Sequence, residues 1–129
     1  MSVELDHAIA PARDKIAAAK RLGELLGVPW AATGAGPFSP VYISDSFTLD
    51  FVQTDQPVEI YHFCFRVSDA EFDAIHGRLV AAGIPYRSNV HGPMDMKINT
   101  DYGGRILYWN VPEGHQWEIL TTSYARQPK

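Results

Sequence analysis

The alternation of hydrophobic and polar positions divides the chain into two similar halves. In the first half, residues 3 to 9 alternate in the manner of a strand with one buried face. Residues 13 to 26 then place apolar side chains at helical spacing, and Gly27 is the expected end of this helix. Three more strands are predicted in this half, at residues 28 to 32, 40 to 43 and 47 to 53. The segment Ser44-Asp45-Ser46 is expected to form a hairpin turn.

The second half repeats this order of elements. It begins with a β-rich run at residues 60 to 67. Ser68, with Glu71 three positions later, predicts a capped helix that ends near Gly83. The strands expected after the helix are at residues 84 to 87, 104 to 111 and 116 to 122. Residues 88 to 103 form a long loop, of a kind that often covers a ligand cleft.

The likeness of the two halves extends to short motifs. The segment Leu26-Gly27-Val28-Pro29-Trp30 matches Ala82-Gly83-Ile84-Pro85-Tyr86, so glycine, an aliphatic residue, proline and an aromatic residue recur in the same order. The repeat is about 55 residues long, which is longer than the repeats of most solenoids, and it occurs only twice. We therefore expect a duplication within one domain, with His7 and His62 on equivalent strands.

Composition and charge narrow the kind of partner. With 129 residues and 46% apolar residues, the chain can bury a proper core without disulfides. Its one cysteine, Cys64, fits a reducing cytoplasmic compartment. No apolar run of about 18 residues and no signal-peptide pattern is present. We therefore expect no membrane association. Because the formal charge is −4, we also expect no nucleic-acid partner, but a small-molecule ligand.

Two histidines and a glutamate stand at places that suggest a metal site. His7 and His62 each lie in the first strand of their half, and Glu118 lies in the last strand of the second half. Two imidazoles and a carboxylate with open coordination positions suit a divalent ion such as Fe(II), Mn(II), Zn(II) or Ni(II). Taken alone, either histidine is more often a buried or interface residue. A buried glutamate, however, needs a partner, and a metal ion supplies one.

The motifs around these residues resemble the vicinal oxygen chelate superfamily. That superfamily includes glyoxalase I, bleomycin-resistance proteins, fosfomycin-resistance thiol transferases, methylmalonyl-CoA epimerase and extradiol dioxygenases. The most specific part is the run from Gly104 to Ile119, which is similar to the family's aromatic strand, Asp-Pro-x-Gly-His turn and x-x-Glu strand, with Val111 in place of the aspartate. The segments Leu5-Asp6-His7 and Tyr61-His62-Phe63 match the first and second ligand positions.

This resemblance implies one α+β domain over residues 1 to 129. It implies two βαβββ modules, about residues 3 to 54 and 58 to 124, that form an open, cupped, barrel-like sheet around a metal cleft. The implied ligands of a divalent metal ion are His7, His62 and Glu118. Many small members of the family are homodimers, and a homodimer is expected here. Whether His7 meets the other two ligands within its own chain or across the dimer stays open.

Three further residues are candidates for the chemistry. By the resemblance, Asp50 lies near the carboxylate of the family's first module, as a fourth ligand or a base, unless it faces solvent. Arg66 shares the strand face of His62 by the two-residue period and would hold a substrate carboxylate or phosphate, or else a salt bridge at the rim. Cys64 on that face is interpreted as a small apolar residue. Tyr108 lies on the strand beside Glu118 and lines the pocket or packs in the core.

The leading functional hypothesis is a metal-dependent enzyme that binds vicinal oxygens of a small substrate and stabilises an enolate or oxyanion. Isomerase, lyase or thiol-transferase chemistry ranks above extradiol dioxygenase chemistry, because the family's extradiol enzymes are usually longer. The alternative is a metal-free dimer of the bleomycin-resistance type, which binds a drug between aromatic side chains such as Trp30, Trp109 and Trp117. A third possibility is a dimer that retains the fold without activity.

Overall fold

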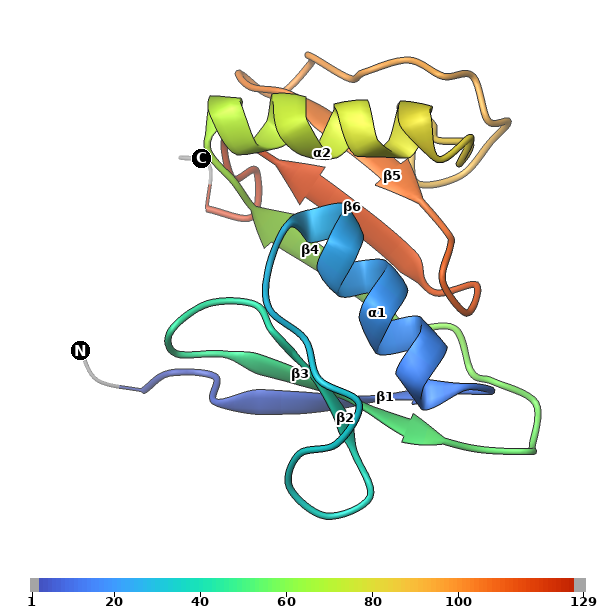
Figure 1. Ribbon diagram of the computed structural model, residues 1–129. Helices are drawn as coiled ribbons and strands as arrows, with labels where there is room; N and C mark the ends of the chain where they lie inside the picture. The colour runs from blue at the N-terminus through green and yellow to red at the C-terminus, as the bar shows by residue number, and fades with distance from the viewer. Residues whose placement is uncertain (1–2, 127–129) are drawn as a thin grey trace. The chain divides into compact units, whose positions relative to one another are not determined.

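The chain divides into two compact units, residues 1–59 and 60–129, and the computed structural model describes residues 3–126. Within the described residues, each unit contains a three-stranded mixed sheet and one helix (Figure 1). The elements of the first unit are β1 (His7–Ala12), α1 (Lys15–Leu26), β2 (Ser39–Tyr42) and β3 (Thr48–Gln53). Those of the second unit are β4 (His62–Arg66), α2 (Asp69–Ala81), β5 (Ile106–Trp109) and β6 (Gln116–Leu120).

The two sheets have the same strand arrangement. In the first unit β3 lies between β1 and β2, parallel to β1 and antiparallel to β2. In the second unit β6 lies between β4 and β5 with the same directions. The chain is therefore α+β with two βαβββ-like modules, which confirms the fold class predicted from the sequence.

The strand predicted directly after each helix is reduced to a single bridge. Trp30 pairs with Val41 in the first unit, and Arg87 pairs with Tyr108 in the second. Pro29 lies directly before Trp30, and Pro85 lies two residues before Arg87. Proline has no N–H to donate to a ladder, so each proline limits the extension of its bridge toward the N-terminus. The predicted first strand was also too long at its start, since β1 begins only at His7.

The helix ends follow from local hydrogen bonds. Asp14 caps α1 by accepting a hydrogen bond from the backbone N–H of Ala17, and Gly27 ends the helix at φ 73°. Ser68 and Glu71 form the predicted capping box at the start of α2. Among the described residues, no helix is long and apolar enough to cross a membrane.

The sheet of the second unit has two different faces. Successive residues of a strand point to opposite sides, so Trp117 and Ile119 point away from Glu118 on β6. Trp117 and Ile119 are fully buried, and α2 lies across this sheet with Phe72 and Ile75 buried (Figure 1). We infer that the helix covers the face of Trp117. The other face carries Glu118 and, by the register of β4, Cys64, with His62 on the same side of that strand.

Candidate functional site

The candidate site of the second unit is built around a carboxylate that is completely shielded from solvent. Glu118 has no exposed surface, and its neighbours in the register are Cys64 on β4 and Tyr108 on β5. An ionised carboxylate in such a place requires hydrogen-bond donors. Its Oε1 lies 3.0 Å from Nε2 of His62. The hydroxyl of Tyr124 lies 2.9 Å from both carboxylate oxygens.

His62 connects this buried carboxylate to solvent. The imidazole starts β4 and is 41% exposed, whereas the Glu118 side chain is fully buried. An imidazole nitrogen and a carboxylate oxygen within hydrogen-bond distance are two donor atoms of the kind that catalytic divalent ions use. The chemistry of this pair therefore fits part of a metal site, since an ion would take the place of the proton that the two atoms now share.

The titratable groups around Glu118 are held in their protonated forms. Burial, followed by the nearby charge of Glu118, raises the pKa of Tyr108 to about 12. Burial also raises the pKa of Tyr124, and hydrogen bonding to Glu118 raises it further. The pKa of the Cys64 thiol is raised by burial and then by the charge of Glu118. These shifts favour the protonated forms of all three groups beside the carboxylate, and a raised pKa disfavours the thiolate form of Cys64.

The first unit holds a second histidine beside a second carboxylate. His7 starts β1, and its Nδ1 lies 2.7 Å from Oδ2 of Asp6. Asp50 on β3 is 8% exposed. Burial raises the pKa of Asp50, while the nearby charge of His7 lowers it. His7 and Asp50 line one pocket of about 420 Å³, together with Asp6 and Tyr42.

His7 and Asp50 occupy the same positions in the first sheet as His62 and Glu118 occupy in the second. Ile9, two residues after His7, pairs with Asp50. Cys64, two residues after His62, pairs with Glu118 in the same parallel arrangement. The prediction that His7 and His62 start equivalent strands is therefore confirmed, and Asp50 is the counterpart of Glu118.

The predicted ligand set is divided between the units. Among residues 3–126, no three His, Cys, Asp or Glu side chains gather closely enough to hold a metal ion. His62 and Glu118 meet within the second unit, whereas His7 belongs to the first. The three-residue metal site and the catalytic roles of Asp50, Arg66 and Tyr108 thus stay predictions.

Tyr124 is a site residue that sequence reasoning missed. It follows β6 in a segment without regular structure, where no periodicity indicates the direction of a side chain. Its ring lies 5.6 Å from that of Tyr102. Tyr102, Tyr108, Tyr124 and Val90 line an apolar pocket of about 470 Å³, which we call the tyrosine pocket. Since the hydroxyl of Tyr124 contacts Glu118, this pocket adjoins the His62 and Glu118 pair.

The long loop between α2 and β5 is held in place next to this pocket. Arg87 is buried, and its guanidinium donates hydrogen bonds to the carbonyl oxygens of Asn89 and Val90 and to the side chain of Asn110. These bonds position Val90, which contributes to the wall of the tyrosine pocket. The loop therefore contributes a wall residue to the tyrosine pocket, whereas its predicted role in covering a ligand cleft stays a prediction.

Comparison with solved structures gives matches over nearly the whole chain. The structure titled "Oxidase ChaP-H2" has a TM-score of 0.90 and 38% sequence identity, and covers 96% of this chain and 97% of its own. "Oxidase ChaP-H1" has a TM-score of 0.88 and 40% identity, with 95% and 98% covered. The fosfomycin resistance protein FosX from Mesorhizobium loti is 20% identical, with a TM-score of 0.69 and 97% of each chain covered, and shows the fold alone. Neither a family model nor a curated protein matches the chain.

Proposed function

The chain belongs to the vicinal oxygen chelate superfamily, and from this premise we propose that it is a metal-dependent enzyme acting on vicinal oxygens of a small organic substrate. The observation that carries the proposal is the fully buried carboxylate of Glu118 beside the half-exposed imidazole of His62. A buried ionised group is expensive to maintain for structural reasons alone. Tyr124 lines the tyrosine pocket and contacts this carboxylate through its hydroxyl, and a buried charged group next to a pocket is a common arrangement of catalytic groups.

The type of reaction is proposed from the similar structures. Both structures with 38% and 40% identity carry the word oxidase in their titles, and both cover more than nine-tenths of this chain. This similarity favours oxidative chemistry over the isomerase, lyase or thiol-transferase chemistry that the sequence ranked first. We therefore propose an oxidase that uses a redox-active ion, Fe(II) or Mn(II), in preference to Zn(II) or Ni(II).

The proposed ligands are His62 and Glu118 from the second unit and His7 from the first. Such an ion supplies a Lewis acid and a redox centre when bound. Asp6 accepts a hydrogen bond from Nδ1 of His7, which leaves Nε2 as the coordinating nitrogen and fixes the ring orientation. The hydroxyl of Tyr124 donates to the carboxylate of Glu118 and so fixes the orientation of that carboxylate.

The remaining candidate residues receive the following roles. Asp50, whose pKa is raised by burial, is proposed to accept a proton from a substrate hydroxyl or to serve as a fourth ligand. Tyr108, protonated at neutral pH, is proposed to donate a hydrogen bond to a substrate oxygen. The tyrosine pocket is proposed to hold the apolar body of the substrate and to exclude water from it.

We propose a homodimer in which His7 of one subunit joins His62 and Glu118 of the other. Support comes from the family, because many small members are dimers and some complete their site across the interface. The equivalence of His7 and Asp50 to His62 and Glu118 also supports it, since an isologous dimer then forms two identical sites.

Metal content tests the proposal directly. Elemental mass spectrometry of untagged protein is expected to give about one transition-metal ion per chain. His62→Ala and Glu118→Ala, after circular dichroism shows that they are folded, are expected to lose the ion. His91→Ala removes an exposed histidine and is the control that keeps it. No metal in folded wild-type protein, even after reconstitution with Fe(II), Mn(II), Ni(II) and Zn(II), overturns the proposal and favours a metal-free ligand-binding protein.

A further inference from the structure

A second pocket shares Tyr124 with the tyrosine pocket. It has a volume of about 270 Å³. Cys64 and Arg66 of β4 line it on one side, and Tyr124 and Arg126 from the segment after β6 line it on the other. We call it the arginine pocket. One aromatic side chain thus separates an apolar pocket from a pocket that contains two guanidinium groups.

The arginine pocket lies on the strand face that carries His62. His62, Cys64 and Arg66 alternate along β4 and so point to the same side of the sheet. Cys64 is paired with Glu118, and Arg66 is paired with Leu120 two residues further along. At about 3.3 Å per residue, the backbone positions of His62 and Arg66 are roughly 13 Å apart. A group bound by Arg66 therefore belongs to a part of the ligand remote from the reacting oxygens.

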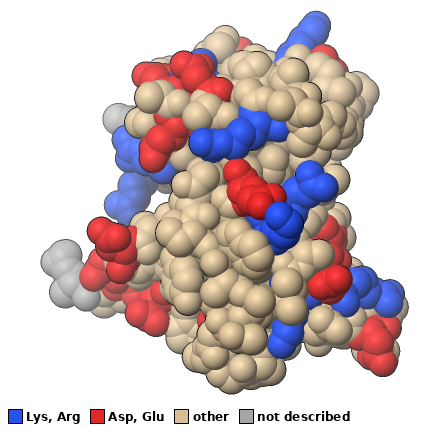
Figure 2. Space-filling view, in the orientation of Figure 1, with Lys and Arg blue, Asp and Glu red and all other residues tan. Residues whose placement is uncertain are grey.

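The two arginines of this pocket are not neutralised within the described part of the chain. Neither Arg66 nor Arg126 has an ion pair or a side-chain hydrogen bond among residues 3–126. Arg105, by contrast, is paired with Asp69 and Asp73. Figure 2 shows basic side chains along the same edge of the second unit as the end of the described chain, with acidic side chains above them.

Two unpaired guanidinium groups in one pocket repel each other, and an anion between them removes that repulsion. A guanidinium presents its N–H groups as a fork that matches two oxygens of a carboxylate or phosphate group. The formal charge of the whole chain is −4, so a general attraction for anions does not explain this local excess of positive charge.

We propose that the arginine pocket binds an anionic group of the substrate, a carboxylate or a phosphate, and so orients the substrate toward His62 and Glu118. That the bound molecule is a substrate rests on the proposed function, whereas the binding of an anion between the two arginines does not. It defines the ligand class as a molecule with an apolar ring body for the tyrosine pocket and an anionic group several bonds away from the oxygens that react.

The test uses two probes of nearly the same shape, one with an anionic and one with an uncharged end group. 4-Phenylbutyrate and its uncharged amide, 4-phenylbutyramide, are titrated by calorimetry into wild-type protein at low salt. The carboxylate is expected to bind at least about tenfold more tightly than the amide, as a charge-assisted hydrogen-bonded pair predicts. Arg66→Gln and Arg126→Gln are each expected to reduce this ratio, and the double variant is expected to abolish it. Arg66→Lys is expected to restore the ratio only in part, because lysine lacks the planar fork.

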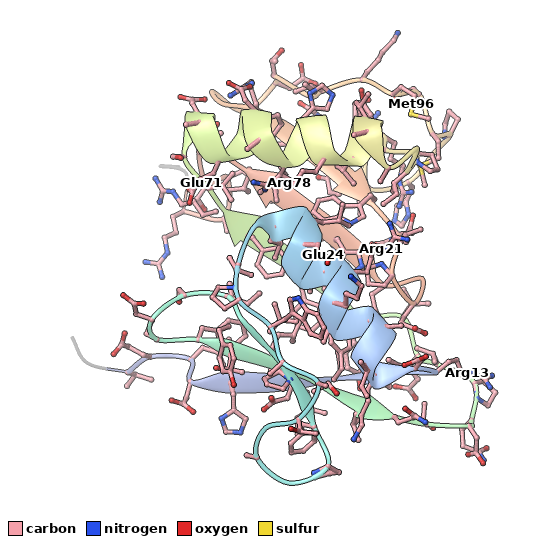
Figure 3. All side chains as sticks on the ribbon, viewed as in Figure 1. Arg13, Arg21, Glu24, Glu71, Arg78 and Met96 are labelled. Carbon is pink, nitrogen blue, oxygen red and sulfur yellow. The ribbon has the colours of Figure 1, made fainter. Side chains whose placement is uncertain are left out.

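Arg21→Gln is the matched control, since it removes an exposed arginine of α1 in the first unit (Figure 3). It is expected to keep the full preference for the carboxylate. Equal affinity for the two probes in wild-type protein, or a preference that survives in the folded double variant, overturns the proposal. Competition with inorganic phosphate and with acetate then assigns the anion, because the stronger competitor identifies the preferred group.

The metal content of the wild-type protein separates this inference from the proposed function. A preference for the carboxylate in folded wild-type protein that binds no metal, even after reconstitution, supports the anion pocket and contradicts the metal-dependent enzyme. A wild-type protein that holds metal through His62 and Glu118 but does not distinguish the two probes overturns the anion pocket and leaves the proposed function intact.

Discussion

The hydroxyl of Tyr124 lies 2.9 Å from both carboxylate oxygens of Glu118, although Tyr124 belongs to the irregular segment after β6 and Glu118 to the centre of that sheet. The contact connects the end of the described chain to its most buried charged group. It also places one aromatic ring in the walls of both the tyrosine pocket and the arginine pocket. Tyr124 thus couples the position of this segment to the orientation of a proposed metal ligand.

Tyr124→Phe removes the hydroxyl and keeps the ring. Because Glu118 then loses a donor in a site without solvent, we expect the free energy of unfolding to fall by about 1–2 kcal/mol. Urea denaturation at neutral pH measures this change. Tyr102→Phe is the control, since its ring contacts Tyr124 but its side chain is exposed, and a change within about 0.5 kcal/mol is expected there. Equal stability of the two variants would contradict a structural role for the Tyr124 hydroxyl.

The sequence predicts those parts of the fold that depend on neighbouring residues. The capping box of Ser68 and Glu71 closes within one helical turn, so the local sequence contains all of its determinants. The pairing of Tyr108 with Glu118 follows from two strands joined by a short turn, and it is observed. The strand expected near Trp30 is only a single bridge. The prediction was too long because a pattern of apolar residues does not take account of the missing backbone N–H of Pro29.

The candidate site is predicted less completely, for a physical reason. His62 and Glu118 are recognisable because each lies in a strand with a fixed period, and their side chains meet. Tyr124 and Arg126 have no such period, and their directions depend on how the chain leaves β6. The arginine pocket therefore becomes visible only when Arg66 and Arg126 are seen to line the same cavity.

Replacing glycine by alanine is expected to have opposite effects on stability at two helical positions, Gly23 and Gly77. A Cβ at Gly23 would lie 2.9 Å from Cβ and Cδ1 of Trp30, whereas a Cβ at Gly77 meets nothing within 4 Å. Gly23→Ala is expected to lower the free energy of unfolding by about 1–3 kcal/mol through this overlap. Gly77→Ala is expected to raise it by about 0.5–1 kcal/mol, because alanine loses less backbone entropy in a helix. Urea titrations of both variants test the pair, and a stabilised Gly23→Ala would contradict the close packing of Trp30 on α1.

The capping box predicts a dependence of stability on pH. The backbone N–H of Ser68 donates a hydrogen bond to Oε1 of Glu71, which is labelled at the start of α2 in Figure 3. Hydrogen bonding to Ser68 lowers the pKa of Glu71 from the usual 4.5. A lowered pKa means that the unfolded chain binds the proton first, so this contribution is present above pH 4.5 and is lost as the pH falls through the folded-state pKa.

Glu71→Gln removes that titration and keeps a hydrogen-bonding side chain. The difference in unfolding free energy between wild type and Glu71→Gln is therefore expected to be larger at pH 7 than at pH 3, with wild type favoured at pH 7. Denaturant titrations at the two pH values measure it. A difference that does not change with pH would show that the charge of Glu71 does not contribute to the cap.

The division of ligands between the units allows a test by mixing two defective variants. His7→Ala lacks the ligand of the first unit, and Glu118→Ala lacks a ligand of the second, so neither is expected to bind metal alone. If each site combines His7 of one subunit with Glu118 of the other, a heterodimer of the two variants contains one intact site. Unfolding and refolding an equimolar mixture would then restore metal to about a quarter of the chains, because half of the dimers are mixed and each has one complete site.

Elemental mass spectrometry of the refolded mixture, purified as a dimer, gives the answer. A mixture of His62→Ala with Glu118→Ala is the control, because both changes lie in the same unit and no pairing of chains restores a site that needs both side chains from one subunit. Recovery in the first mixture and not in the control is the expected result. Wild-type metal content with no recovery in either mixture would mean that His7, His62 and Glu118 act within a single chain.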